Sequence, residues 1–513
     1  MLRRRLGFLF AAACWAACSS VAVAQEKKPE QGEESGAEAK PKLGEEKVPV
    51  VQTHEIEIGG AAISYTSTTG TIPLKDDEGN PTASVFYVAY TREGVGTEGE
   101  PEKRPLMFAF NGGPGSSSVW LHMGALGPRR VPFPGDGTEL PKPPFALTDN
   151  AFSVLDVADL VFIDPVSTGF SRASKPGEAE KFHGLEEDIE SVGSFVRLYV
   201  TRNRRWASPK FLIGESYGAV RAAGLVRHLQ DRYGMYCNGV VLLSGLLDFS
   251  TLRAAPNNDL PYVLFLPTMT ATSFHHRRLD DELMADFSAT LRRSEEFARG
   301  PYANALFQGN ALEGEERSRI AGLVARYTGL DAGLVERSNL RISTSRYRRE
   351  VLGPETGRSV GRFDGRVLGW ESDRAAVQPE YDPSYSVVLG PYASTVNDYL
   401  RRGLGFESDL PYEILTGLRW NYPGDAGYVS VSGRLRDAMR DNPHLKVLVA
   451  CGYYDLATPH FAILHSLNHL DLDEELRSNI RVEYYQGGHM MYTNPAELEK
   501  LKKDLTGFIG SAF

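Results

Sequence analysis

The sequence predicts a mostly parallel α/β fold, and three observations support this prediction. From Val50, segments rich in β-branched and aromatic residues alternate with turns, which is typical of an antiparallel meander over 54–58, 62–65 and 83–91. Further on, short and almost entirely apolar runs alternate with helical patterns, as expected for strands buried on both faces of a parallel sheet. Between Gly245 and Val447 the chain is too long for a loop, which indicates an insertion.

Each expected element follows from one of these patterns. Buried strands are expected at 106–110, 160–163, 211–213, 240–243, 447–450 and 480–485. The helices that cover them are expected near 184–201, 217–232, 459–470 and 496–510. Amphipathic stretches at 279–299, 313–327, 394–402 and 431–440 indicate a largely helical lid, with an irregular part over 337–369. The core then comprises 49–249 and 441–513, and the inserted lid comprises 250–440.

The N-terminal sequence predicts export. Arg3 to Arg5 precede an apolar run from Leu6 to Cys18, and Ala22-Val23-Ala24 offers small residues to a signal peptidase. We expect residues 1–24 to be a signal peptide, because the apolar run is short for the ~20 residues of a membrane span. Residues 25–48 have few large apolar groups and are expected to form a flexible charged linker. The protein is therefore expected to be secreted or periplasmic, with no membrane span after signal cleavage.

Composition limits the class of protein. Of the 513 residues, 42% are hydrophobic and 24% charged, a globular balance that allows a sizeable core. The formal net charge of -10 disfavours nucleic acid as a partner. No motif implies a cofactor or a metal, since His465 and His469 lack the glutamate of the H-E-x-x-H pattern. Outside the signal, Cys237 and Cys451 are expected at opposite ends of parallel strands, as separate thiols.

The segment Gly214-Glu215-Ser216-Tyr217-Gly218 matches the G-x-S-x-G pattern. It lies between an expected strand and an expected helix, the context in which this pattern forms the nucleophile elbow of α/β-hydrolases. The tight turn exposes the serine Oγ at the positive end of a helix, where a developing oxyanion is stabilised. The alternative is an ordinary turn flanked by glycines. Because strand and helix are both expected here, we predict the α/β-hydrolase fold with Ser216 as the nucleophile.

A serine hydroxyl needs a base, and this fold carries its catalytic residues in the order serine, acid, histidine. Asp455 follows the expected strand 447–450, and His489 follows the last expected strand after two glycines. A helix-capping aspartate is the alternative for Asp455, but its place in the strand order favours catalysis. We predict that His489 accepts the Ser216 proton and that Asp455 orients the imidazole.

A glycine-rich loop follows the strand expected at 106–110 and reads Asn111-Gly112-Gly113-Pro114-Gly115-Ser116-Ser117-Ser118. In this fold such a loop supplies the second oxyanion-hole amide. A phosphate-binding loop is the alternative, but the Lys-Ser/Thr ending is missing. Together with Gly-Glu-Ser-Tyr at 214–217, the segment 162–171 and Gly488-His489-Met490, this loop resembles the serine carboxypeptidase family. The segment 361–366 is similar to bacterial members.

This resemblance implies roles for further residues. The backbone amides of Gly113 and Tyr217 would form the oxyanion hole. Asn111, the Gly112 amide and Glu215 would bind the C-terminal carboxylate of the substrate. A glutamate there must be protonated, because an ionised one would repel the ligand, and burial holds such a proton. The resemblance therefore implies that peptides bind best at acid pH.

Three positions depart from the family's pattern. Ala125 stands where a second glutamate shares the proton with the first, so carboxylate recognition is expected to be weaker, differently built or tuned to another pH. Ser116 replaces a cysteine and removes half of a usual disulfide. Gly218-Ala219 reverses the family's usual Ala-Gly order and restores the general hydrolase pattern.

We expect a serine-type carboxypeptidase that hydrolyses peptides with a free C-terminal carboxylate through an acyl-enzyme. The replacement at Ala125 motivates a second hypothesis, a secreted serine esterase or acyltransferase of the same fold. A third hypothesis is a binding module without catalysis, against which the complete triad argues. Release of amino acids from peptides separates the first from the second, and fluorophosphonate labelling of Ser216 separates both from the third.

Overall fold

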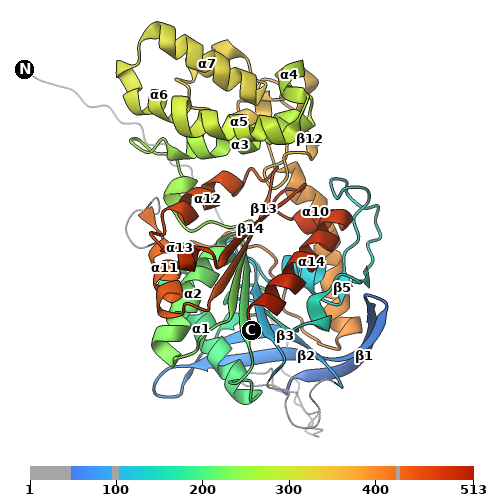
Figure 1. Cartoon of the computed structure of the whole chain (residues 1–513). Coiled ribbons are helices and arrows are strands. Elements are labelled where there is room, and N and C mark those ends of the chain that lie inside the picture. The colour runs from blue at the N-terminus through green and yellow to red at the C-terminus, as the bar shows by residue number, and fades with distance from the viewer. Residues whose placement is uncertain (1–47, 95–102, 423–427) are drawn as a thin grey trace, which may run out of the picture. The chain divides into compact units, whose positions relative to one another are not determined.

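A mixed sheet forms the centre of the computed structural model. The structure describes residues 48–94, 103–422 and 428–513. The strands run in the spatial order β1-β2-β3-β7-β4-β9-β10-β13-β14, with β8 paired to β3 (Figure 1). Their bounds are β1 Val50–Ile58, β2 Ala61–Lys75, β3 Pro81–Arg92, β4 Leu106–Phe110, β7 Asp159–Ile163, β8 Arg172–Ala173, β9 Lys210–Glu215, β10 Gly239–Leu243, β13 Lys446–Gly452 and β14 Ile480–Tyr485. Two short pairs lie apart from it, β5 Arg129–Arg130 with β6 Thr148–Asp149 and β11 Arg358–Val360 with β12 Leu368–Trp370.

Strand directions in the sheet match the sequence prediction. β1, β2 and β3 pair antiparallel, and β3 pairs antiparallel with β7. From β7 onward every neighbouring pair is parallel. The α/β-hydrolase fold class, with a mostly parallel sheet and antiparallel N-terminal strands, is therefore confirmed. The parallel register also brings the chain after β9, β13 and β14 to one edge of the sheet, because carboxyl ends of parallel strands meet there.

Helices cover both faces of the sheet because alternate strand residues enter two different cores. In β10, Val240 and Leu242 belong to one core and Val241 and Leu243 to the other. Helices α1, α2 and α11 pack on the first face, and α14 and α10 on the second (Figure 1). These helices span α1 Leu185–Arg202, α2 Tyr217–Tyr233, α10 Pro383–Asp398, α11 Ser432–Asp441 and α14 Pro495–Ser511; α12 (His460–Asn468) and α13 (Glu474–Arg477) follow β13.

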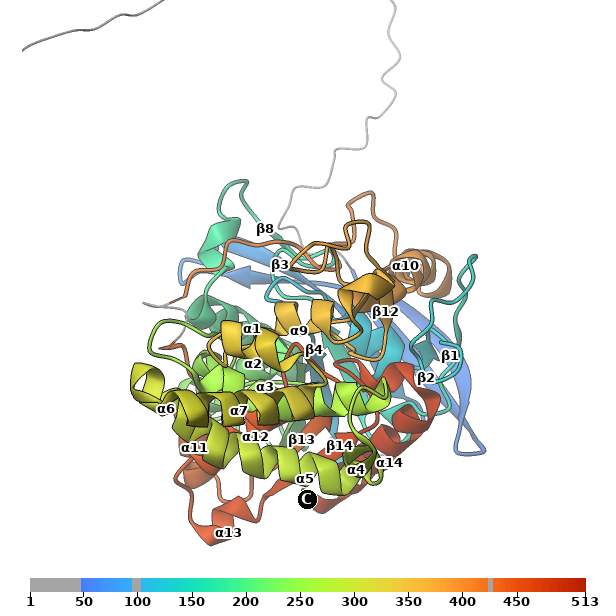
Figure 2. The same cartoon turned by 90° about the horizontal axis from the view of Figure 1, so that it is seen from above.

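The lid helices form a core of their own. They are α3 Leu260–His275, α4 Asp281–Met284, α5 Phe287–Phe297, α6 Ala303–Gln308, α7 Gly314–Thr328, α8 Ala332–Arg337 and α9 Thr344–Glu350. In Figure 2, α3, α5 and α7 lie side by side above the sheet, and α3 contacts α12 of the catalytic core. The stretch expected to be irregular, 337–369, contains α9 and the hairpin β11-β12.

Several sequence predictions concern features outside this framework. The expected signal peptide and residues 25–47 of the expected linker lie outside the described residues. Cys237 and Cys451 are both free and buried, as expected. In the described ranges, no three or more His, Cys, Asp or Glu side chains are grouped to hold a metal ion. None of the helices described is both long and apolar enough for a membrane span.

Candidate active site

Ser216 lies at the sharp turn between β9 and α2. Its φ of 62° and ψ of -126° are a backbone conformation that residues other than glycine rarely adopt. The turn is possible because Gly214 lacks a side chain: a Cβ there would lie 1.9 Å from the carbonyl oxygen of Gly218. Such stored backbone strain is characteristic of functional sites. Ser216 is also the N-cap residue of α2, so it lies at the positive end of the helix dipole.

Asp455 and His489 lie together on the loops after β13 and β14. Nδ1 of His489 is 2.7 Å from Oδ2 of Asp455, and both side chains are buried. Oδ1 of Asp455 accepts hydrogen bonds from the amides of Ala457 and Thr458, at 2.8 and 3.0 Å. Burial alone would lower the pKa of His489, but the charge and hydrogen bond of Asp455 outweigh burial and raise that pKa. The pair is thus built to stabilise an imidazolium.

Thr458 is a site residue that sequence analysis did not single out for this role. Its hydroxyl lies 2.8 Å from Oδ2 of Asp455 and 3.1 Å from Nδ1 of His489. It also donates to the carbonyl of Ser244, at 2.7 Å. Thr458 therefore fixes the acid and the base relative to the end of β10. The sequence offered only its position three residues after Asp455.

One pocket unites most of the predicted site residues. It has a volume of about 150 Å³ and is bordered by Asn111, Gly112, Gly113, Glu215, Ser216 and His489. The remaining wall comes from Pro114, Ser116, Trp120, Arg362, Phe363, Tyr385, Val388, Leu415 and Met490. Apolar and aromatic side chains with a few polar groups are typical of a site for an organic ligand.

The glycine-rich loop after β4 lies directly on the elbow. A Cβ on Gly112 would be 2.4 Å from the amide nitrogen of Tyr217, so only glycine fits there. Gly113, the next residue, has a φ of +100°. The structure thus brings together the loop and the amide that were predicted to form an oxyanion hole. The Asn111 carbonyl accepts a 2.6 Å hydrogen bond from the buried Arg221, which fixes the start of this loop.

Glu215 is buried beside Ser216, and its carboxyl group has two hydrogen-bond partners. The Tyr492 hydroxyl donates to Oε2 at 2.7 Å, and the Asn111 side chain bonds the same group. Oδ1 of Asn111 accepts from the Leu121 amide at 3.0 Å, which turns its NH₂ group toward the glutamate. Burial raises the pKa of Glu215 to about 7, although both hydrogen bonds favour the ionised form.

Ala125 lies on the π-helical turn Leu121–Leu126 and is buried. Tyr492 packs against this turn, since a Cβ on the neighbouring Gly124 would lie 2.5 Å from its ring. A phenol from the chain after His489 is therefore one of the two hydrogen-bond partners of the Glu215 carboxyl group. Sequence analysis missed Tyr492; its proximity to His489 was the only available signal.

A lid segment, residues 361–366, bridges the two loops that carry Asp455 and His489. The His489 amide donates to the Phe363 carbonyl at 2.6 Å, and the Gly365 amide donates to the Tyr454 carbonyl at 2.9 Å. The Phe363 ring stacks on the His489 imidazole, with centroids 5.0 Å apart. The lid thus contacts the acid loop, the base loop and the imidazole itself.

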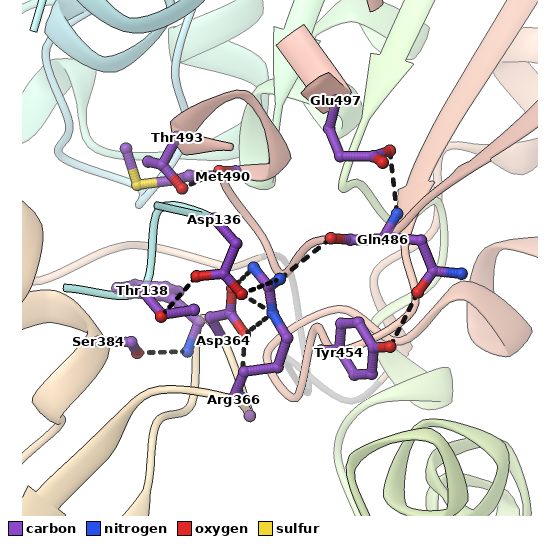
Figure 3. A network of polar contacts seen from close by, with 12 residues as sticks. Asp136, Thr138, Asp364, Arg366, Ser384, Tyr454, Gln486, Met490, Thr493 and Glu497 are labelled. Atoms are coloured by element: carbon purple, nitrogen blue, oxygen red, sulfur yellow. Dashed lines mark hydrogen bonds and ion pairs between the residues drawn. The ribbon is translucent and has the colours of Figure 1, made fainter. Parts of the chain in front are cut away.

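Arg366 is the centre of this bridge (Figure 3). Its guanidinium pairs with Asp364 at 2.7 Å and with Asp136 at 3.3 Å, and it donates to the Gln486 carbonyl at 3.1 Å. The Gln486 side chain in turn accepts a 2.8 Å hydrogen bond from Tyr454. Arg366 and Asp364 are almost fully buried, so this charge pair is shielded from solvent.

Comparison with known proteins agrees with the resemblance expected from the motifs. A family model described as serine carboxypeptidase matches residues 62–305, which include Asn111 and Ser216. Serine carboxypeptidase-like 8 of Arabidopsis thaliana is 26% identical over 184 residues, 35% of this chain and 38% of that protein. Serine carboxypeptidase-like 33 of the same plant is 31% identical over 135 residues, 26% of each. The matched part of the chain thus spans less than half the length of these relatives.

Solved structures that match this chain include VinJ and a proline iminopeptidase of Mycobacterium smegmatis. VinJ is 13% identical with a TM-score of 0.38, over 87% of this chain and 99% of that chain. The iminopeptidase is 14% identical with a TM-score of 0.38, over 86% of this chain and 98% of that chain.

Proposed function

We propose that this chain, a serine hydrolase related to the serine carboxypeptidases through residues 62–305, removes C-terminal residues from peptides. One observation supports the proposal above others. Ser216 and His489 border the same pocket as Glu215, Asn111 and the Gly112–Gly113 loop. The proposed nucleophile, the proposed base and the proposed carboxylate-binding groups therefore border one pocket.

The proposed reaction is acyl transfer. Ser216 Oγ attacks the carbonyl carbon of the last peptide bond while Nε2 of His489 takes its proton. Asp455 stabilises the resulting imidazolium, and the amides of Gly113 and Tyr217 stabilise the oxyanion. The imidazolium then gives its proton to the departing amine, which leaves as the free C-terminal residue. Water, activated by His489, hydrolyses the ester that remains on Ser216.

Recognition of the α-carboxylate is assigned to Asn111, the Gly112 amide and Glu215. A protonated Glu215 donates a hydrogen bond to this carboxylate, whereas an ionised one repels it. Because the pKa of Glu215 is raised to about 7, the neutral form dominates in acid and is lost above neutrality. We therefore expect free-acid peptides to be cleaved best below neutral pH.

A secreted serine esterase or acyltransferase is the second candidate. Ala125 favours it, because the second glutamate of the family's carboxylate site is missing here. The same nucleophile, base and oxyanion-hole amides would then act on an ester, with no requirement for a free carboxylate.

The decisive experiment compares a peptide with its C-terminally amidated form between pH 4 and 8, with mass spectrometry of the products. A carboxypeptidase shortens the free acid one residue at a time and acts poorly on the amide. Equal cleavage of both forms, or internal cleavage, would contradict the proposal. Hydrolysis of p-nitrophenyl esters without release of any amino acid would favour the esterase, and Ser216→Ala is the inactive control for both.

We also propose that the protein is exported, because residues 1–24 have the pattern of a signal peptide. Fractionation of producing cells, with N-terminal sequencing of the mature protein, tests this. A mature chain that begins after Ala24 is expected, and retention of Met1 in the cytoplasm would contradict export.

A further inference from the structure

Arg362 borders the active-site pocket from the lid, and its backbone is fixed on both sides. Its own amide donates to Asp382 at 2.9 Å, and the next amide, of Phe363, donates to Ser384 at 2.9 Å. The Phe363 carbonyl accepts the hydrogen bond from His489 described above. The side chain of Arg362 therefore starts from a point that is held relative to the base.

The guanidinium of Arg362 lies close to His489. Its central carbon is 5.4 Å from the centroid of the Phe363 ring, and that ring stacks on the imidazole. The positive charge of Arg362 also acts against protonation of His489 and partly offsets the rise in its pKa. A cation beside the base is unfavourable for an imidazolium, so a compensating function is expected of it.

The Arg362 side chain is exposed, and no described carboxylate forms an ion pair with its guanidinium. The two acids adjacent to the segment have other partners. Asp364 pairs with Arg366, and Asp382 pairs with Arg348 and accepts from the Ser384 hydroxyl. By contrast with Arg366, Arg362 presents an unused, forked donor to the pocket, the geometry that binds a carboxylate best.

The reaction indicates which part of a substrate meets Arg362. His489 must protonate the departing amine, so the leaving residue lies on the His489 side of Ser216. In the proposed function its α-carboxylate is directed to Asn111 and Glu215, and both of these residues belong to the catalytic core, not to the lid. The side chain of the leaving residue is then the group nearest Phe363 and Arg362.

We propose that Arg362 binds the side-chain carboxylate of a C-terminal aspartate or glutamate, and so selects peptides that end in an acidic residue. The proposal rests on the carboxypeptidase function above and specifies its substrate class. The apolar stem of the leaving side chain packs on the Phe363 ring, and its carboxylate accepts from the guanidinium. The Arg366 bridge holds the segment in place, so little ordering is needed when the substrate binds.

The test compares peptides that differ only in the last residue, Glu or Gln, each as free acid and as amide. Wild-type protein is expected to have a kcat/KM about tenfold higher for the Glu peptide, the size of a charge-assisted hydrogen bond. Arg362→Gln is expected to abolish this preference by lowering kcat/KM more for the Glu peptide than for the Gln peptide, and Arg362→Lys is expected to retain part of the preference. Arg358→Gln is the matched control, because that arginine stacks on Trp370 at 3.4 Å and does not border the pocket.

Binding of the same peptides to Ser216→Ala protein, by calorimetry, separates this proposal from the proposed function. Tighter binding of the Glu peptide that disappears in Ser216→Ala/Arg362→Gln supports the role of Arg362 even if no peptide is hydrolysed. Hydrolysis without a Glu preference would overturn the role of Arg362 and leave the carboxypeptidase function intact. A second outcome would also overturn the role of Arg362. If Arg362→Gln lowered kcat/KM equally for the Glu and Gln free acids but not for the amides, Arg362 would be assigned to the α-carboxylate.

Discussion

The Tyr492 hydroxyl donates a 2.7 Å hydrogen bond to Oε2 of Glu215, so a phenol is bonded to this buried glutamate. A second carboxyl group would share a proton with Glu215, whereas the phenol keeps its own proton and donates to either form of Glu215, more strongly to the ionised one. The hydrogen bond therefore lowers the pKa of Glu215. Burial has the opposite effect and outweighs the hydrogen bond, so that the pKa is raised to about 7.

Tyr492→Phe is expected to raise the pKa of Glu215 further, because the ionised carboxylate loses a donor. The alkaline fall in kcat/KM for a free-acid peptide should move to higher pH, by roughly one unit for one hydrogen bond to a charge. Tyr485→Phe is a matched control, since its buried hydroxyl donates to Asp504 at 2.8 Å outside the pocket. An alkaline limb that stays in place, or moves to lower pH, would contradict the assignment of Glu215.

How far the sequence predicted this site depends on the kind of signal each residue carried. The strands were predictable because they are short apolar runs buried on both faces, as Leu106–Phe110 and Gly239–Leu243 are. Ser216, Asp455 and His489 were predictable because each follows a strand of the parallel sheet. Helix α3 was not, because its buried positions surround the helix and leave no amphipathic period.

The missed site residues act through contacts that no local pattern encodes. Tyr492 reaches Glu215 across 277 positions of sequence, and the Thr458 hydroxyl serves both Asp455 and His489. Phe363 belongs to a lid segment whose sequence indicates only a similarity to bacterial members. Its stacking on His489 follows from tertiary packing of the lid on the base loop.

Glu215→Gln is expected to change the pH dependence of stability. The pKa of Glu215 is about 7 in the folded protein, against an ordinary value of 4.5, so the folded state retains a proton that the unfolded chain releases in this window. Glu215 therefore makes the wild-type protein less stable as pH rises from 4.5 to about 7. Relative to the wild type, Glu215→Gln should gain about 3 kcal/mol of unfolding free energy across this window.

Denaturant unfolding of both proteins at about pH 4.5 and pH 8 measures this change. Comparing the two proteins cancels other buried acids, such as Asp164, whose pKa is raised to about 6. Glu215→Gln should also retain hydrolysis of free-acid peptides at the higher pH, because glutamine stays neutral. A stability difference that is the same at both pH values would show that Glu215 ionises normally.

Asp455→Asn is expected to lower kcat by about 10⁴ with the fold intact, because the asparagine amide favours the wrong imidazole tautomer. The amides of Ala457 and Thr458 can still bond the remaining oxygen, so the loop should keep its conformation. Turnover of an ester and a peptide, with circular dichroism, checks both points. Asp504→Asn, a buried acid paired with Lys500 outside the pocket, is the control. Activity within about tenfold of wild type would remove Asp455 from the proposed triad.

Arg366 is expected to act as a positioning residue for His489. Arg366→Lys keeps the charge beside Asp364, but a single ammonium cannot reproduce the forked contacts with Asp364, Asp136 and the Gln486 carbonyl. We expect kcat to fall about tenfold for peptide and ester alike, with KM little changed, since a base displaced by a fraction of an ångström loses alignment. Arg319→Lys, an exposed arginine paired with Glu316, is the matched control. Folded Arg366→Lys protein with wild-type kcat, or a loss confined to KM, would show that the bridge serves only the stability of the lid.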